Sequence, residues 1–165
     1  MPAFYLESKD NPKNKHLRGL IEQNSFRKKQ RQTVLEGTQL TLAFLAKNRK
    51  IHSIFTTEVA MSHPDLEKIN ELYDGYVFVI SESLYKDLST LGTSLACLAI
   101  VDLPSSPEAL NFKEDTLILD NIQDPGNVGT LLRSAAAAGI EQVVCTKGSA
   151  SIWSPRVLRA GMGAH

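Results

Sequence analysis

Short, β-rich apolar runs alternate along the chain with segments of helical periodicity, and this alternation restricts the chain to an α/β fold. The runs 76–80 (YVFVI) and 95–101 (LACLAIV) are almost continuously apolar, as expected for strands buried on both faces of a sheet. Residues 14–32 begin with an amphipathic helical pattern. Other apolar, strand-like runs lie at 33–35, 51–57, 116–119 and 142–146, and helices are predicted at 38–48, 65–73, 82–91 and 128–138.

Several of the predicted helices carry recognisable end signals. Thr38 and Asn127 are predicted N-caps, because short polar side chains accept hydrogen bonds from the first helical turn. Asp124-Pro125-Gly126 is interpreted as a turn before the helix predicted at 128–138. Gly92 and Gly139 are predicted C-terminal stops, because glycine tolerates the left-handed conformation that ends many helices.

The composition changes at residues 102–115 (DLPSSPEALNFKED), where prolines and serines replace the apolar pattern. We interpret this segment as a linker between a domain at 1–101 and a second domain at 116–165. In the second domain a strand, a helix and a strand follow one another with short connections, which predicts a right-handed parallel βαβ unit. Both halves are therefore predicted to be α/β.

The charges are balanced in number but not in position. The 165 residues contain 18 Lys and Arg against 18 Asp and Glu, so the formal net charge is zero. Residues 1–50 carry 11 basic and 4 acidic side chains, whereas residues 51–115 carry 3 and 11. The zero sum excludes a wholly polycationic or acidic-tail protein, while the basic N-terminal part favours an anionic partner such as nucleic acid.

The densest basic cluster is the run from Arg27 to Arg31. Such a cluster attracts RNA phosphates without sequence preference and in a salt-sensitive manner. The four cations Arg27, Lys28, Lys29 and Arg31 are therefore candidate RNA contacts. The alternative interpretation is a solvated turn between two elements.

Membrane, secretory and metal-binding functions have no support in the sequence. No apolar run approaches the ~20 residues that a membrane span needs, and the N-terminus lacks the apolar core of a signal peptide. Cys97 and Cys145 are interpreted as buried free thiols, which predicts a reducing cytoplasmic location. No Cys/His spacing indicates zinc, so no metal is expected.

The chemically informative segment is 120–139 (DNIQDPGNVGTLLRSAAAAG), in which a polar loop joins a strand end to a helix start. Ligands of open α/β sheets bind at that edge. Asn127 and Arg133 are the candidate functional side chains, and Gly129 permits close approach of a backbone or a ligand. From the residues alone, a helix cap at Asn127 and a surface ion pair at Arg133 remain open as an alternative. The segment lacks GxGxxG and GxxxxGK[ST], which disfavours a dinucleotide-dependent oxidoreductase.

The string LILDNIQDPGNVGTLLRSAAAAGIEQVVCTKGS resembles the first motif of the SpoU (TrmH) family of RNA ribose 2′-O-methyltransferases, in the SPOUT superfamily. The string WSPRVLRAGMGAH resembles that family's second motif, with Gly161 where many members have serine. Residues 1–101 resemble the family's auxiliary RNA substrate-binding domain, a ribosomal-protein-like α/β domain. The resemblance implies methyl transfer from S-adenosylmethionine to a ribose 2′-hydroxyl of structured RNA, either rRNA or tRNA.

The resemblance also implies roles for individual residues. Asn127 and Arg133 match the polar positions of the first motif, on the RNA-facing side of the catalytic site. Arg156 and Arg159 match basic positions of the second motif and are expected phosphate contacts. A guanidinium is a poor base, so we expect Arg133 to clamp a phosphate or stabilise a developing alkoxide.

The family's chains continue beyond the second motif into the segment that forms the trefoil knot, the cofactor loops and most of the homodimer interface. We therefore expect residues 116–165 to be only the first βαβ part of an α/β-knot domain, with the knot absent and the cofactor-binding residues unknown. The expected consequence is a C-terminally truncated, inactive chain from a methyltransferase. A non-catalytic RNA-binding module is the alternative function.

Overall fold

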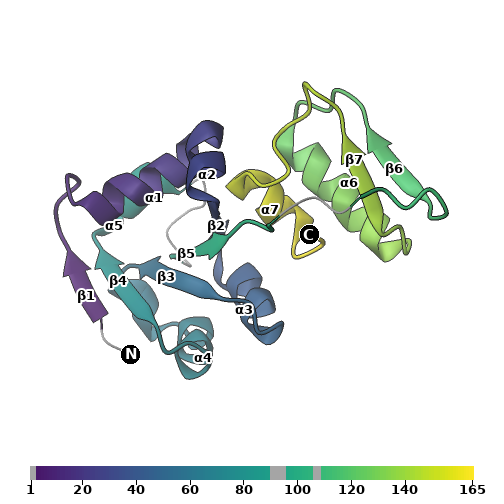
Figure 1. The fold of residues 1–165 in the computed structure, drawn as a ribbon. Coiled ribbons are helices and arrows are strands. Elements are labelled where there is room, and N and C mark those ends of the chain that lie inside the picture. Colours follow the sequence, from purple (N-terminus) through teal and green to yellow (C-terminus); the bar gives the residue numbers. More distant parts are fainter. Residues whose placement is uncertain (1–2, 90–95, 106–108) are drawn as a thin grey trace. The chain divides into compact units, whose positions relative to one another are not determined.

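The computed structural model describes residues 3–89, 96–105 and 109–165, and the chain divides into two compact units, Met1–Asp102 and Leu103–His165. We call them the first and the second unit and describe each by itself. Both units combine strands and helices, as the alternating pattern predicts (Figure 1).

The first unit is built on a five-stranded mixed sheet in the order β1-β4-β3-β5-β2. Strands β1, β4 and β3 pair in parallel, whereas β5 is antiparallel to both β3 and β2. Strands β1, β2, β3 and β4 therefore run in the same direction, and their C-terminal ends lie at one edge of the sheet, which we call the carboxyl edge. Their N-terminal ends lie at the opposite edge, which we call the amino edge. The strands are β1 (Ala3–Leu6), β2 (Gln32–Glu36), β3 (Ile51–Thr56), β4 (Tyr76–Ile80) and β5 (Cys97–Asp102).

Helices cover both faces of this sheet (Figure 1). Side chains of α1 and α5 pack with Phe55, Phe78 and Leu98 in one buried cluster. The helices α3 and α4 lie on the other side of the sheet. The helical elements of the unit are α1 (Pro12–Glu22), α2 (Asn24–Gln30), α3 (Thr38–Ala46), the 3-10 helix η1 (Val59–Ser62), α4 (Pro64–Leu72) and α5 (Glu82–Leu88).

The central strands are buried as the apolar runs predict. Every residue of β4 after Tyr76 and every residue of β5 before Asp102 is buried. Leu17 and Leu20 of the amphipathic segment lie in α1, and both are fully buried. Burial on both faces explains why these runs show no alternation of apolar and polar residues.

One sequence-based detail of the first unit is wrong, and one strand was missed. Thr38 is the first helical residue of α3, after Gly37 as N-cap, and its hydroxyl donates to the Asp65 carboxylate at 3.0 Å. The short edge strand β1 was not predicted, because four residues next to a polar segment give too little periodicity. The C-terminal stop predicted at Gly92 lies outside the described residues.

The second unit contains β6 (Thr116–Leu119), α6 (Pro125–Ala137), β7 (Gln142–Cys145) and α7 (Pro155–Gly161). β6 and β7 pair in parallel with Leu117 opposite Val143, which confirms the predicted parallel arrangement. Gly139 follows the C-cap of α6 with a φ of 75°, as predicted. Leu119, Val128, Leu132 and Val157 form the buried cluster of this unit.

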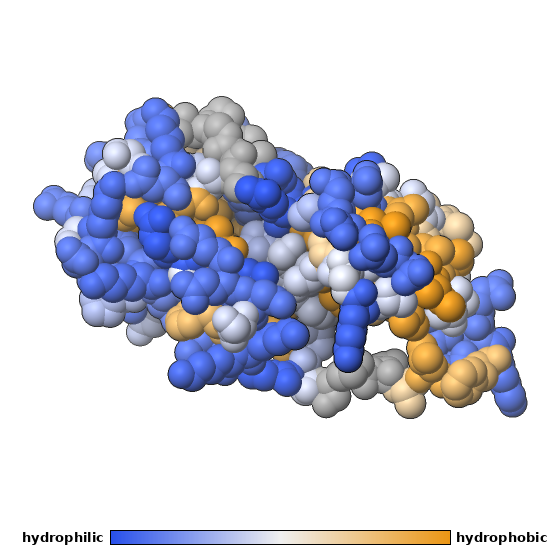
Figure 2. Space-filling view, turned by 90° about the horizontal axis from the view of Figure 1, so that it is seen from above, coloured by the Kyte–Doolittle hydropathy of each residue, from blue (hydrophilic) through white to orange (hydrophobic). Residues whose placement is uncertain are grey.

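The two-stranded sheet leaves much apolar surface uncovered. Ile118 in the middle of β6 is 63% exposed, and all four residues of β7 are only partly buried. The part of Figure 2 occupied by this unit accordingly shows a broad orange, apolar area. A sheet this small buries little of its own apolar surface.

The second half of the predicted linker is attached to the second unit. The Asn111 N–H donates to Gln142 Oε1 at 2.7 Å, and Gln142 Nε2 donates to the Asn111 carbonyl at 2.9 Å. Gln142 begins β7, so this segment is held against the sheet before β6 starts.

Candidate functional site

The candidate site begins where α6 follows β6. Asp124 is the N-cap of α6, and its Oδ1 accepts the Asn127 N–H at 2.7 Å. The predicted cap at Asn127 and the predicted turn at Pro125-Gly126 are therefore wrong, because both lie inside the first helical turn. Asn127 is exposed, and its side-chain amide has no hydrogen bond within the described parts of the chain. Asn127 therefore does not act as the cap of this helix.

The loop before α6 is fixed by the loop after β7. The Thr146 hydroxyl donates to Asp120 at 2.7 Å and accepts the Asn121 N–H at 3.1 Å. The Ser149 hydroxyl donates to the Leu119 carbonyl and accepts the Ile122 N–H, both at 3.1 Å. These bonds join the carboxyl ends of β6 and β7 and fix the direction in which α6 starts. Sequence reasoning missed them, although residues that follow adjacent parallel strands are expected to meet at one edge.

Arg133 lies on the exposed surface of α6. Six residues separate it from Asn127, which corresponds to about 9 Å along the helix axis and about 120° around it. Among residues 3–89, 96–105 and 109–165, none forms an ion pair or hydrogen bond with the Arg133 guanidinium. The surface ion pair considered from the sequence is therefore not formed, and Asn127 and Arg133 can contact one ligand only if it extends along the helix.

The second-motif helix α7 packs directly on the first-motif helix α6. A Cβ at Gly129 would collide with the Ala160 Cβ and lie 2.7 Å from the Val157 carbonyl oxygen. The close approach predicted at Gly129 is thus that of a neighbouring helix. Both motifs therefore form one packed substructure.

The candidate phosphate contacts of α7 have different surroundings. Arg156 is exposed and has no ion pair in the described segments, whereas Arg159 is only partly exposed and interacts with other groups. The Ser154 hydroxyl caps the helix by accepting the Val157 N–H at 3.4 Å. Arg156 is accordingly the cation of this helix that is open to an anionic ligand.

The basic run lies on α2 and at its end, and its members are not equivalent. Arg27 is only 4% exposed, and its Nη1 donates to the carbonyls of Leu20 at 2.9 Å and Ile21 at 3.1 Å. Burial lowers the pKa of Arg27. The prediction of Arg27 as an RNA contact is therefore corrected: this side chain holds the end of α1. Lys28, Lys29 and Arg31 are exposed, and Arg31 ends α2 in the left-handed conformation.

The polar side chains that follow β6 and β7 in the second unit bind groups of the same two loops. At the carboxyl ends of β6 and β7, the side chains of Asp120, Thr146 and Ser149 are already hydrogen-bonded to this loop system. Nowhere in the described ranges do three or more His, Cys, Asp or Glu side chains gather as metal ligands. No described helix is long and apolar enough to cross a bilayer.

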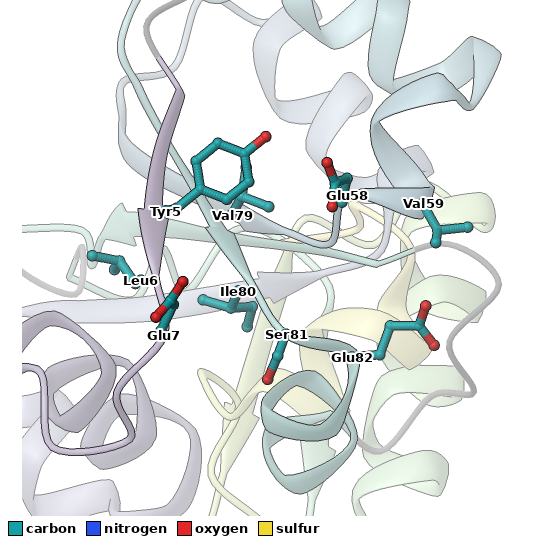
Figure 3. A pocket seen from close by; sticks show the side chains of 9 residues that line it. All are labelled: Tyr5, Leu6, Glu7, Glu58, Val59, Val79, Ile80, Ser81 and Glu82. Atoms are coloured by element: carbon teal, nitrogen blue, oxygen red, sulfur yellow. The ribbon is translucent and has the colours of Figure 1, made fainter.

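A separate cavity of about 450 Å³ lies at the carboxyl edge of the first unit's sheet. Figure 3 shows the carboxylates of Glu7, Glu58 and Glu82 around it, together with Tyr5 and Val59. Three carboxylates repel phosphate, so this cavity does not fit a nucleic-acid backbone.

Comparison with known proteins identifies the second unit. Residues 115–165 match the model of the SpoU rRNA Methylase family. The chain is 34% identical over 154 residues to mitochondrial rRNA methyltransferase 3 of Mus musculus, covering 88% of this chain and 36% of that protein. It is 29% identical over 160 residues to the 23S rRNA (guanosine(2553)-2′-O)-methyltransferase RlmP of Bacillus subtilis, covering 97% of this chain and 61% of that protein.

The fold is shared with a solved structure, an AdoMet-bound rRNA methyltransferase from Sinorhizobium meliloti. The TM-score is 0.78 at 25% identity, over 98% of this chain and 61% of that one. The chain thus spans between about a third and about three fifths of the length of these relatives. The second unit, over residues 115–165, is therefore similar to the SpoU rRNA Methylase family.

Proposed function

We propose that the protein containing this chain transfers a methyl group from S-adenosylmethionine to a ribose 2′-hydroxyl of structured RNA, either rRNA or tRNA. The observation that carries the proposal is the exposed Arg133 guanidinium, which no described residue engages, in a segment that matches the SpoU family. The B. subtilis relative, whose name specifies 2′-O-methylation, supports the ribose as the target.

Arg133 and Asn127 have distinct proposed roles. When the 2′-oxygen gains the methyl group it loses its proton, and negative charge develops on it during the reaction. A protonated guanidinium is a poor base but a strong anion partner, so Arg133 binds the adjoining phosphate or stabilises the developing alkoxide. Asn127 positions the nucleotide through its free amide. S-Adenosylmethionine, when bound, supplies the methyl group as an activated sulfonium substituent.

The remaining cations are proposed RNA contacts. Lys28, Lys29 and Arg31 extend the contact on the first unit, and Arg156 with Arg159 extends it on α7. Arg27 is removed from this set because its guanidinium is bound to backbone carbonyls. In this proposal the first unit is the RNA substrate-binding domain, and the second is the first part of an α/β-knot domain.

The polypeptide of residues 1–165 is proposed not to transfer methyl groups by itself. The polar side chains at the carboxyl ends of β6 and β7 bind one another, and the apolar side chain of Ile118 in the middle of β6 is exposed. The proposed active form is a homodimer of the longer protein. The proposed compartment is the cytoplasm, in keeping with the free thiols of Cys97 and Cys145, although the mouse relative is named as mitochondrial.

The test is genetic complementation. The encoding gene is disrupted in its source, and 2′-O-methylated nucleosides of rRNA and tRNA are measured by mass spectrometry. We expect loss of a specific ribose methylation, restored by the wild-type gene and by Thr130→Ala but not by Arg133→Ala. An unchanged inventory of ribose methylation after disruption would contradict the proposal.

A non-catalytic RNA-binding module is the second candidate. It is favoured by the exposed cations of α2. This function predicts salt-sensitive RNA binding in vitro together with unchanged ribose methylation after gene disruption. The same two measurements therefore separate the two candidates.

A further inference from the structure

A second cavity of the first unit, of about 350 Å³, lies at the amino edge of the sheet, opposite the acidic cavity. Its volume is in the ~300–1,000 Å³ range of small-molecule sites. The lining is aromatic, basic or uncharged, and contains no carboxylate. It is formed mainly by Lys13, His16, Gln32, His52, Tyr76 and Phe78.

Exposed aromatic rings continue from this cavity onto the edge strand. Phe4 of β1 is 44% exposed and Tyr76 of β4 is 58% exposed, with ring centroids 6.0 Å apart. Phe4 is paired in register with Phe78, and their centroids are also 6.0 Å apart. Two neighbouring rings thus present accessible surface beside a hollow, an arrangement on which unpaired nucleobases stack.

One lysine lies beside the same rings. Lys13 Nζ lies 4.6 Å from the centroid of Phe78, at the start of α1. His16 forms a 2.9 Å hydrogen bond with Gln32, the residue that directly follows Arg31 of the basic run. The cavity therefore reaches the first residue of β2, directly after the basic run.

The charges of the two cavities indicate which class of ligand each cavity can bind. One carboxylate, that of Asp102 at the end of β5, lies next to the lining residue His52, whose Nε2 is 2.7 Å from its Oδ1. The acidic cavity at the carboxyl edge carries three carboxylates, so charge complementarity assigns an anionic aromatic ligand to the amino edge alone.

We propose that the cavity at the amino edge binds an unpaired base of the RNA substrate, stacked on Phe4 and Tyr76, with Lys13 on the adjoining phosphate. This inference rests on the proposed function, because it requires that the first unit binds RNA. It deepens that function by specifying a single-stranded loop, bulge or end as the bound element. Bases inside a duplex are stacked on one another and cannot use the rings.

The experiment measures the affinity of the purified chain for fluorescently labelled oligouridine, oligoadenosine and a blunt RNA duplex by fluorescence anisotropy. Phe4→Ala and Tyr76→Ala are expected to weaken single-strand binding at least about 5-fold each, while Tyr76→Trp retains it. Tyr5→Ala is the matched control: Tyr5 is 62% exposed on the same strand but lines the acidic cavity, and its loss should change nothing.

Lys13→Ala tests the phosphate contact. We expect the slope of log affinity against log salt to fall by about 0.7, the value for one phosphate of a single strand. Circular dichroism melting of each variant verifies folding. Crosslinking of 4-thiouridine-labelled oligouridine, mapped by mass spectrometry, supplies a measurement that needs no variant, and the crosslink is expected on the peptide containing Tyr76.

The outcomes separate this inference from the proposed function. If the wild-type chain binds RNA but Phe4→Ala and Tyr76→Ala bind equally well and no crosslink maps to this edge, the inference is wrong while RNA binding stands. Equal loss with Tyr5→Ala, or a preference for the duplex, also overturns it. If the wild-type chain binds none of the RNAs, RNA binding by the first unit fails as well.

Discussion

Gly129 of α6 and Ala160 of α7 lie in direct contact, because residue 129 has no side chain. A Cβ there would also approach the backbone nitrogen of Gly161 to 2.8 Å. The two motif helices are consequently packed too closely to admit a side chain at residue 129 without a shift. Their packing fixes the position of Arg156 relative to Arg133.

Gly129→Ala is expected to destabilise the second unit by about 1–3 kcal/mol, because the helices must separate to admit a methyl group. The chain has a single tryptophan, Trp153, in that unit, so its fluorescence during urea unfolding reports the change. Thr130→Ala, at the exposed neighbouring position, is the control. Equal midpoints for both variants would show that the helices are not in tight contact.

Asp124→Ala is expected to cost about 1 kcal/mol of stability in the second unit, because α6 loses the acceptor for the Asn127 N–H. Asn127→Ala should leave the urea midpoint nearly unchanged, because its exposed amide makes no bond in the described structure. The Trp153 signal measures both. A larger loss of stability with Asn127→Ala than with Asp124→Ala would instead identify Asn127 as the helix cap.

Arg27→Ala is expected to destabilise the first unit by about 1.5–3 kcal/mol, since the carbonyls of Leu20 and Ile21 lose a charged donor. Far-ultraviolet circular dichroism during urea unfolding measures this loss. Charge reversal of Lys28, Lys29 and Arg31 together should weaken RNA binding and reduce its salt dependence. RNA affinity unaffected by the triple reversal would reject these residues as contacts.

The first unit is expected to lose stability above about pH 9. Burial raises the pKa of Cys97 to about 11 from an ordinary value of 9.0, so the folded state holds this proton more tightly than the unfolded state. The stability that this buried thiol contributes is fully present below pH 9 and is lost as the pH rises through 11. Urea unfolding midpoints between pH 8 and 11 measure the slope of stability against pH. Cys97→Ala should flatten it, and the half-buried Cys145→Ala should leave it unchanged.

The secondary structure followed from local patterns wherever those patterns were long enough. Continuous apolar runs indicated β4, β5 and β6, and helical spacing of Leu17 and Leu20 indicated α1. The strand β1 was missed because Ala3–Leu6 is a short edge strand stabilised by its pairing with β4. Helix starts were misplaced at Thr38 and Asn127, because several polar residues in succession can all serve as caps.

The candidate site was predicted with uneven success for a related reason. A motif specifies residue types and spacing, so Asn127, Arg133 and Arg156 could be selected from the sequence and are exposed. The same reasoning selected Arg27, whose burial depends on carbonyls at the end of another helix. The aromatic surface of Phe4 and Tyr76 carries no sequence signal, because strand pairing alone brings together residues 72 positions apart.

The sequence by itself determined the α/β class, the change of composition after Asp102, the SpoU-type motifs and the basic character of the N-terminal part. Each of these depends on residues close to one another along the chain. Only the tertiary structure decided which cations are exposed, which residue caps α6, why position 129 is glycine, and that basic and acidic cavities occupy opposite edges of one sheet. These features depend on contacts between distant segments, and sheet order and helix packing create such contacts.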